Sequence, residues 1–458
     1  MPNLARLAAL AALLAAPSLR AAAQGAPATT DPAGPSSPLP RSGGGSGRGE
    51  PQLTEDDVVR RALARSPVLR AARARAEVTQ AQASSLRGHL LPGVDVSDEF
   101  QHWDSNFSVA FALPGLPPAA MLAREQDTNS FVVAAGQPLL GLLHLGADYS
   151  AAGAQTDAAR ADLLAAEAAV REQVREQLLR LYEARALGEI AKASVAQLSE
   201  QLQVARSRVE AGVLTNADAL RVETALANAR QQVIQAQAQE QSEKAGLLIA
   251  VGESPYAPVD FAEPILPEPA ALPGLEPAVQ LARSRRPELE GARRAETAAS
   301  RRATARALDL LPEVSAEAAY LHVTGQVFQP IDSGFVGIKA DWPIWDWGAK
   351  WYARSAAASQ ADAAAAQAVQ VQDQVENEVA ARLAATIAAG NAVEVARTAI
   401  ASAEEAYRVT DALVRAGSAT TTDLLDSQSA LTTARQNLTR ARYAYAGARI
   451  ALSRAMGE

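Results

Sequence analysis

The segments VEAGVLTNADAL (209–220) and VRAGSATTTDLL (414–425) are two versions of one short phrase. Their glycines, Gly212 and Gly417, stand 205 residues apart, because 417 − 212 = 205. The same offset separates three further pairs: Asp218 and Asp423, Pro138 and Pro343, and the endings VGE (251–253) and MGE (456–458). The two stretches therefore run in register without a net insertion, which indicates an internal duplication.

Upstream of these stretches the offset is larger. Pro67 matches Pro287, and Leu91-Pro92 matches Leu311-Pro312, each 220 residues apart. The stretch from Pro92 to Pro138 in the first copy is therefore 15 residues longer than the stretch from Pro312 to Pro343 in the second, because 220 − 205 = 15. We predict three successive parts: a first repeat at 53–253, a linker at 254–276 and a second repeat at 277–458.

Each repeat is predicted to hold the same series of elements. A first helix (54–91, 277–311) precedes a segment in which apolar and polar residues alternate (92–138, 312–343). A very long helix follows (147–211, 350–416), and a return helix then ends near 250 or 455. Val375, Val379, Leu383 and Ile387 step by four, as one face of an α-helix does. A helix of about 65 residues spans roughly 97 Å, too long for a compact core, so these helices are predicted to form a coiled-coil-like bundle or tube.

Glycine-led turns are predicted at the far tips of the helical hairpins, near 212–216 and 417–422. Gly212 and Gly417 suit the left-handed backbone that commonly ends a helix. Residues with a side-chain oxygen then cap the return helices. The candidates are Thr215 or Asn216 in the first repeat and Thr421 or Thr422 in the second, with Thr420 in the second turn.

The middle segments alternate apolar and polar residues with the period of a β-strand. In FVGIKADW (335–342), Val336 and Ile338 share one side, and Lys339 and Asp341 share the other. The pattern recurs in three further stretches: FSVAFAL (107–113), SFVVAAGQ (130–137) and VSAEAAYLHV (314–323). We predict about four strands in two hairpins. They form part of a membrane β-barrel or, alternatively, a soluble antiparallel sheet that covers a helix pair.

Four tryptophans cluster where the last predicted strand gives way to a helix: Trp342, Trp345, Trp347 and Trp351. Indole rings favour the boundary between lipid and water. The cluster is therefore a candidate aromatic girdle at the membrane interface. Core packing at a strand–helix joint is the alternative interpretation.

The N-terminus predicts export from the cytoplasm. Residues 1–23 hold one early charge, Arg6, then an apolar run and small residues, as a secretory signal peptide does. Residues 24–52 are rich in Pro, Gly and Ser and are interpreted as a flexible arm. Beyond the leader, no uninterrupted apolar run reaches the roughly 18 residues that a membrane helix needs.

Composition excludes several classes of function. The chain has no cysteine, which excludes disulfides, thiol catalysis and a lipid on an N-terminal cysteine. A formal charge of −8 does not favour nucleic acid as a partner. The four histidines, His89, His102, His144 and His322, are scattered, without metal-ligand spacing or a nucleophile motif. We expect no enzyme, no cofactor and no metal site, and we place most of these histidines on the surface or on strands near membrane level.

Four strands cannot close a membrane barrel alone. Two open edges would leave unpaired backbone groups in hydrocarbon, at several kcal/mol each, and closed barrels start at about eight strands. Strands that span a membrane would therefore have to share a barrel between copies. The long hairpins also need lateral partners to bury their apolar stripes.

In the order and doubling of its motifs, the chain resembles an outer-membrane efflux protein of the TolC family over about residues 54–458. The motifs are ALARSPVL (62–69), SRRPEL (284–289), LLP before each strand pair, GQPLL (136–140), DWPIWDWGAK (341–350) and the two tip phrases. The resemblance implies a mostly α-helical chain with four β-strands. Three chains would form a twelve-stranded barrel in the outer membrane of a Gram-negative cell, continuous with a long periplasmic helical tunnel.

The same resemblance implies the function and the site residues. The trimer would be the passive exit duct of a tripartite efflux or type I secretion system, opened by an inner-membrane pump and a periplasmic adaptor. Asp423 and Asp426 would line the narrowest ring, where grouped carboxylates attract cations, and Asp218 would help to latch neighbouring tips. The family's arginine two residues after the second glycine is Ala419 here, so the latch is absent or differently built.

Other interpretations stay open at this point. Asp218 and Asp423 could simply complement the positive end of a helix. A periplasmic adaptor or a coiled-coil structural protein of the cell envelope would also contain long helices. Adaptors carry one hairpin with compact β-domains, and a rod does not need paired strands, so two halves with paired strands favour the duct.

Overall fold

The computed structural model describes residues 52–111 and 119–458. They form two compact units. The first unit holds residues 79–155 and 297–363, without 112–118, and the second holds 52–78, 156–296 and 364–458. Three predicted features lie wholly or partly outside the described residues: the leader (1–23), the arm (24–52) and the end of the strand at 107–113.

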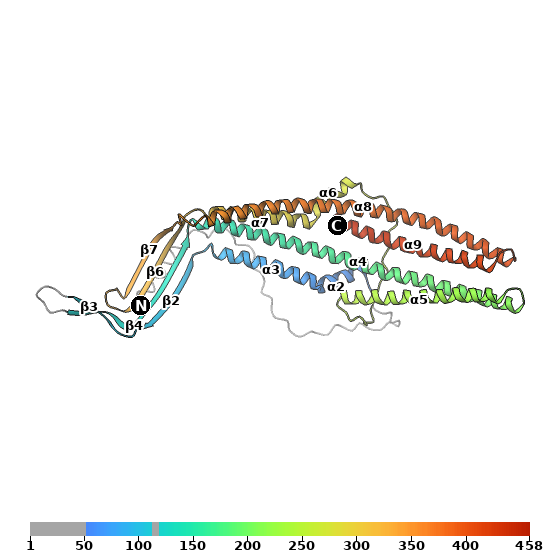
Figure 1. Cartoon of the computed structure of the whole chain (residues 1–458), viewed down its shortest axis with the longest axis horizontal. Coiled ribbons are helices and arrows are strands. Elements are labelled where there is room, and N and C mark those ends of the chain that lie inside the picture. The colour runs from blue at the N-terminus through green and yellow to red at the C-terminus, as the bar shows by residue number, and fades with distance from the viewer. Residues whose placement is uncertain (1–51, 112–118) are drawn as a thin grey trace, which may run out of the picture. The chain divides into compact units, whose positions relative to one another are not determined.

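The first unit contains an antiparallel sheet to which both repeats contribute (Figure 1). Its strands follow the order β2 (Gly93–His102), β4 (Ala119–Pro138), β6 (Glu313–Gln326) and β7 (Asp332–Asp341), and β3 (Phe107–Phe111) pairs with β4. Each repeat supplies one long hairpin, and the hairpins join through β4 and β6. Within the described chain, β2 and β7 are therefore each paired along one side only.

One side of this sheet is apolar and exposed. Residues directly opposite each other on neighbouring strands share a side, and Val94, Ala135, Ala318 and Val336 form such a row from β2 to β7. Val94 is 67% exposed and Val336 is 70% exposed. The described part of the chain thus leaves the outer strands of this apolar side uncovered.

Three predicted strands, at 130–137, 314–323 and 335–342, correspond to β4, β6 and β7. The fourth predicted strand, at 107–113, corresponds to β3 and pairs with β4, but it does not pair with residues 130–137. The strand β2 pairs with residues 127–136 of β4, whereas β3 pairs only with residues 119–124, at the start of β4. Acidic residues within β2 obscured it, because Asp and Glu are rare in strands, although Val94, Val96 and Phe100 keep the apolar alternation.

The second unit is built from helices. The helices formed by the described residues are α2 (Glu55–Arg65), α3 (Pro67–Gly88), α4 (Gly141–Glu210), α5 (Asn216–Ala250), α6 (Leu275–Arg285), α7 (Pro287–Leu308), α8 (Ala349–Arg415) and α9 (Thr421–Ala455). By residue number, α3, α4, α7 and α8 contribute to both units. Two residues of β1 (Gln52–Leu53) pair in parallel with β5 (Asp260–Phe261) of the linker.

Each predicted first helix is two helices. The single helices expected at 54–91 and 277–311 break at Ser66 and Arg286, directly before Pro67 and Pro287. The proline ring disfavours helical backbone in the residue before it, and the ψ angles there are 122° and 121°. The prolines that aligned the two repeats are therefore also helix breaks.

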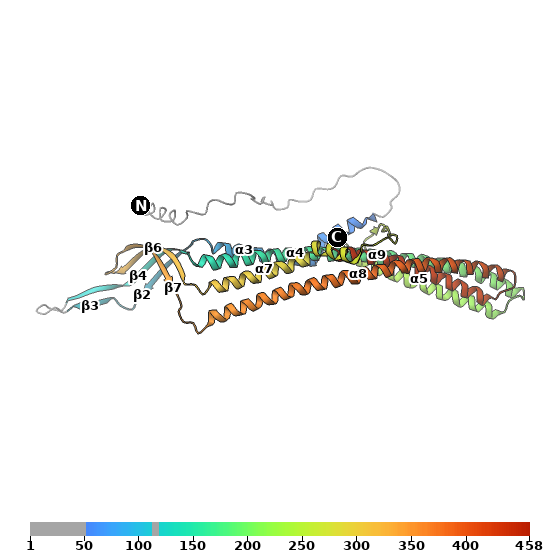
Figure 2. The ribbon, with the colours of Figure 1, turned by 90° about the horizontal axis from the view of Figure 1, so that it is seen from above.

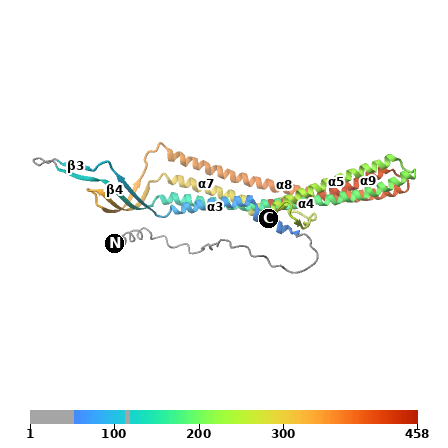
Figure 3. The same cartoon turned by 90° about the horizontal axis from the view of Figure 1, so that it is seen from below.

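Three apolar clusters hold the helices of the second unit together. The first surrounds Phe261 of the linker and contains Leu247, both fully buried. The second surrounds Val379 of α8. The third lies toward the hairpin ends, where Val222 packs between α4 and α5 and Leu425 of α9 packs against the cluster. In this region the α4–α5 and α8–α9 hairpins lie side by side (Figure 2 and Figure 3).

Gly325, near the outer end of β6, occupies a position that only glycine fits. Its φ is +81°, and an added Cβ would lie 2.1 Å from the backbone oxygen of Asp127. The register between β4 and β6 shifts at this level, between Arg124 and Asn129. Glycine accommodates this irregularity because it tolerates the left-handed backbone and the close approach.

We expect Gly325→Ala to destabilise the sheet by about 1–3 kcal/mol, because both the backbone conformation and the contact with Asp127 must change. Gly136→Ala is the matched control on β4, since an added Cβ there meets nothing within 4 Å. Thermal unfolding in detergent, followed by tryptophan fluorescence, measures the difference. Equal melting temperatures for the two variants would contradict this account of Gly325.

Candidate functional site

The first tip is closed by a glycine turn and a capping box. Gly212 has a φ of +72° and follows the end of α4. Thr215 caps α5: its hydroxyl accepts from the Asp218 backbone N–H at 3.3 Å and donates to the Asp218 carboxylate at 2.7 Å. The same carboxylate accepts from the Thr215 backbone N–H at 3.2 Å. Of the two predicted caps, Thr215 or Asn216, the structure therefore assigns Thr215.

The second tip repeats this arrangement. Gly417 has a φ of +76°, and Thr420 caps α9. The Asp423 carboxylate accepts from the Thr420 backbone N–H at 2.8 Å and from the Thr420 hydroxyl at 2.7 Å. The prediction of Thr421 or Thr422 as the cap is wrong by one or two residues. In a run of three threonines, composition alone does not determine which residue is the last one outside the helix.

Both capping carboxylates have lowered pKa values. The hydrogen bond from the Thr215 side chain is the largest cause that lowers the pKa of Asp218, and the Thr420 side chain does the same for Asp423. Hydrogen bonds to a charged carboxylate favour its charged form. Each tip therefore carries a fixed negative charge at neutral pH.

Asp426, the third predicted carboxylate, has a different environment. It lies one turn further along α9 and is exposed. Among the described residues it has no hydrogen bond and no ion pair, whereas Asp218 and Asp423 have local structural roles as capping residues. Helix capping thus explains the positions of Asp218 and Asp423 but leaves that of Asp426 unexplained.

A residue that sequence reasoning missed connects the two tips. Arg221 of α5 donates from Nη1 to the Thr422 hydroxyl on α9 at 2.9 Å, and it lies 3.8 Å from Asp218. The second repeat has Ala419 at the position discussed above, and the arginine that contacts the second tip is Arg221 of the first hairpin. Arg221 follows Asp218 by three residues and so shares its side of the helix, a signal that could have identified it.

A second link between the hairpins lies further from the tips. The Gln201 side chain on α4 donates to the Tyr407 hydroxyl on α8 at 3.5 Å. Both residues line a cavity of about 440 Å³, together with Val222 and Leu424. Polar contacts around an incompletely filled space therefore add to the apolar packing of Leu425 between the hairpins.

Three of the predicted membrane-interface tryptophans, Trp342, Trp345 and Trp347, lie on the connection between β7 and α8, and Trp351 lies in the first turn of α8. Their exposures are 60% for Trp342, 75% for Trp345, 85% for Trp347 and 60% for Trp351. These values rule out core packing within the described chain. The Asp346 carboxylate accepts backbone hydrogen bonds from Gly348 and Lys350, both at 3.0 Å, and so fixes the turn that presents them.

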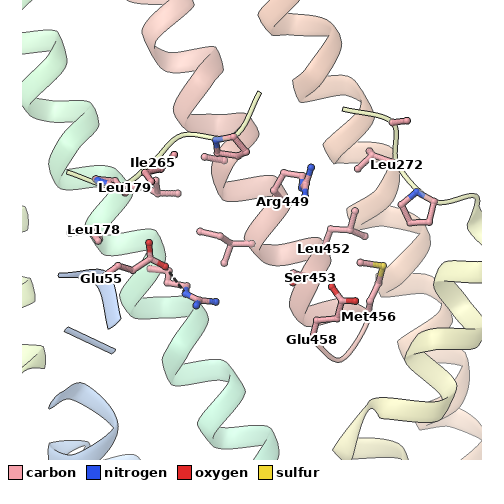
Figure 4. A pocket seen from close by; sticks show the side chains of 17 residues that line it. Glu55, Leu178, Leu179, Ile265, Leu272, Arg449, Leu452, Ser453, Met456 and Glu458 are labelled. Atoms are coloured by element: carbon pink, nitrogen blue, oxygen red, sulfur yellow. Dashed lines mark ion pairs between the residues drawn. The ribbon is translucent and has the colours of Figure 1, made fainter. Parts of the chain in front are cut away.

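Another cavity, of about 340 Å³, lies in the second unit between the linker, α4 and α9 (Figure 4). Leu178, Leu179 and Leu452 line it, and the ion pair between Glu55 and Arg175, at 2.8 Å, crosses one side. Among the described residues, no group of three or more His, Cys, Asp or Glu side chains could hold a metal ion. The polar residues that line this cavity are Glu55, Arg175, Arg449, Ser453 and Glu458.

Comparisons with known proteins agree with this architecture. The sequence model of the outer membrane efflux protein family matches residues 58–253 and 278–458. A comparison with curated protein sequences finds no match.

Solved structures of outer-membrane channels share the fold. The outer membrane protein VceC from Vibrio cholerae aligns with a TM-score of 0.76 and 19% identity over 88% of this chain and 96% of its own. The MtrE outer membrane channel of Neisseria gonorrhoeae aligns with a TM-score of 0.72 and 17% identity over 88% of each chain. CusC aligns with a TM-score of 0.76 and 17% identity over 88% of this chain and 92% of its own. The family match spans both repeats, and we conclude that the chain belongs to the outer membrane efflux protein family and resides in the outer membrane.

Proposed function

We propose that three copies of this chain form the exit duct of a tripartite efflux or type I secretion system. The observation that carries the proposal is the strand order β2-β4-β6-β7, which leaves β2 and β7 open. In a membrane, open strand edges cost several kcal/mol for each unpaired backbone group. Pairing of β7 of one copy with β2 of the next closes twelve main strands into a ring without an edge.

The helices also favour lateral partners. Among the described helices, α8 alone contains an 18-residue window apolar enough to cross a membrane, with a mean hydropathy of 1.3, and only 22% of that window is buried. Val369 and Val395 on this helix are 61% and 70% exposed. Neighbouring copies in a helical tunnel would cover such a face, and its alanines would let the helices approach closely.

The tips are the proposed gate. Three copies of Asp426 and Asp423 would place six carboxylates around the axis, and such rings attract cations. Asp426 supplies a charge that has no hydrogen-bond or ion-pair partner among the described residues, whereas Asp423 also holds the start of α9 through Thr420. A periplasmic adaptor and an inner-membrane pump would open this gate, and the duct itself would transport passively.

We expect a small, cation-preferring conductance from the purified chain in a planar lipid bilayer. In Asp423→Asn/Asp426→Asn, the cation preference should fall by at least about twofold, because the carboxylate ring is neutralised. Asp373→Asn, at an exposed position on α8 remote in sequence from the tip, is the control and should leave the preference unchanged. If the wild type conducts and the double variant keeps the same cation preference, Asp423 and Asp426 do not form the gate. If folded protein shows no conductance, the proposal of a duct is refuted.

The contact between Arg221 and Thr422 should hold the gate closed. Loss of one such hydrogen bond is worth about 1 kcal/mol per chain, so Arg221→Ala should shift the opening equilibrium by about fivefold or more. Arg206→Ala is the matched control, because Arg206 pairs with Glu223 at 3.4 Å within the first hairpin and does not connect the hairpins. Single-channel open probability is the measurement, and equal values for both variants would exclude Arg221 as a latch.

The capping boxes predict an acid limit for the tips. A carboxylate with a lowered pKa stabilises the folded state at pH values above the ordinary aspartate pKa of 3.8. That stabilisation is lost as the pH falls through the lowered pKa of the folded state. Hydrogen exchange of the first-turn amides of α5 and α9, corrected for intrinsic rates, should be constant from about pH 7 to about pH 5 and should accelerate below about pH 4. Asp423→Asn should remove this pH dependence from α9 alone. A transition near neutral pH would contradict the assignment.

A further inference from the structure

Two histidine–aspartate pairs occupy equivalent places in the two repeats. His102 Nδ1 lies 2.6 Å from Asp127 Oδ1, and His322 Nδ1 lies 2.8 Å from Asp332 Oδ1. The histidines are 220 residues apart (322 − 102) and the aspartates 205 (332 − 127), which are the two offsets of the duplication. Each pair is also the outermost register pair of its hairpin. We call these four residues the His–Asp belt.

The belt lies on the apolar side of the sheet. Alternate residues of a strand share a side, so His102 continues the line of Val94, Val96 and Phe100 on β2. On β7, Asp332 begins the line of Val336 and Ile338, which are 70% and 75% exposed. On β7 an exposed apolar stripe therefore ends in a belt residue. On β2 the side that ends in His102 is apolar except for Asp98, which lies between Val96 and Phe100.

Other polar groups accompany the belt on the same side. The Tyr320 hydroxyl donates to Asp332, and the Asn129 side chain on β4 donates to Asp98 on β2 at 2.8 Å. Polar side chains thus replace apolar ones on all four main strands at the end remote from the helices. At the other end, β7 leads into Trp342 and the exposed tryptophan turn.

The spacing of these two boundaries fits the thickness of a membrane. Ten residue steps separate Asp332 from Trp342 (342 − 332), about 34 Å along an antiparallel strand at about 3.4 Å per step. A tilt of about 40° reduces this to a height of about 26 Å, close to the apolar band of about 25 Å in outer-membrane barrels.

The register of the sheet also allows the two His–Asp pairs to lie at the same height in the membrane. The row of His322 and Asp332 meets Phe131 on β4 and Asp98 on β2, four residues before His102. Tilted strands in a closed barrel are staggered against their neighbours. Residues at equal height on β2 and β6 are therefore not expected to be register partners, and an offset of a few residues between them is expected.

We propose that the His–Asp belt lies in the headgroup layer of the outer leaflet, where it marks the outer limit of the lipid-covered surface. The inference rests on the proposed barrel. Charged side chains on the lipid side cost most at the bilayer midplane and little near the interface, so a belt that ends an apolar stripe fits the interface. Imidazole N–H groups and carboxylates match the phosphates of the headgroups and their counter-cations, and the strands join the periplasmic helices at the opposite end.

Spin labels can locate the belt, because the chain has no native cysteine. Single cysteines at Asp127, Asp332, Val336, Ile338 and Phe335 would carry a nitroxide, in vesicles of phosphatidylethanolamine and phosphatidylglycerol. The ratio of collision with oxygen to collision with a polar nickel chelate reports depth. We expect a ratio at Val336 and Ile338 at least about threefold above that at Asp127 and Asp332. Phe335, on the opposite side of β7, should resemble the belt positions.

Two results would overturn the proposal, and they differ in what they imply. Oxygen-rich ratios at Asp127 and Asp332, equal to that at Ile338, would place the belt in hydrocarbon and leave the barrel intact. Ratios at Val336 and Ile338 equal to that at Phe335 would show that this side does not face lipid, and the proposed barrel would fail with the belt.

A double variant tests whether the histidines set the boundary. In His102→Leu/His322→Leu, a label at Thr324, the next residue outward on the same side of β6, should show at least about a twofold higher ratio. His89→Leu is the control, because His89 follows α3 outside the sheet. Retention of heat-modifiable migration on gels confirms folding of each variant. An unchanged ratio at Thr324 in the folded double variant would show that the histidines do not set the boundary.

Discussion

The unpaired edges of β2 and β7 are the constraint on which the rest of this molecule depends. Each edge presents a row of backbone N–H and C=O groups, and the outer membrane offers no water to satisfy them. A two-edged sheet is therefore unstable there unless the edges meet one another across copies of the chain. The need to close the sheet follows from hydrogen bonding, and the proposed three copies would place three sets of helical hairpins and three pairs of tips around one axis.

The two repeats contain the same series of elements, and they differ at a few positions. Both repeats carry a hairpin of strands, a helix break before proline, a glycine turn and a capping box. The differences are local: Trp342 of the second repeat corresponds to Gln137 of the first, so the tryptophan turn occurs once per chain. The arginine that connects the tips comes from the first repeat, where Arg221 reaches Thr422. The two halves thus differ at the tryptophan turn and at the contact between the tips.

Much of the fold could be predicted because its signals are local. The four-residue step of Val375 to Ile387 predicts a long helix wherever its partners lie, and the glycines at 212 and 417 indicate turns through their own backbone freedom. The helix breaks at Ser66 and Arg286 are also encoded locally, because each directly precedes a proline, Pro67 or Pro287. The strand β2 was missed because its acidic residues outweighed the alternation of Val94, Val96 and Phe100.

The contacts that matter at the candidate sites are not local. Arg221 and Thr422 are 201 residues apart in sequence, and the His–Asp pairs become visible only when the strand register is known. Arg286, 5% exposed, pairs with Glu378 on another helix, although arginine clusters usually indicate a solvated surface. Composition and periodicity predict which elements form, whereas the pairing of individual side chains depends on how those elements pack.

The mass of the intact assembly tests the shared barrel most directly. The mature chain would be extracted from the outer membrane in mild detergent and weighed by native mass spectrometry. The account predicts a complex of three identical chains that stays intact until the detergent conditions unfold the sheet. A folded monomer, or a stable complex of any other number of chains, would contradict the closure of one barrel by β2 and β7 of three copies.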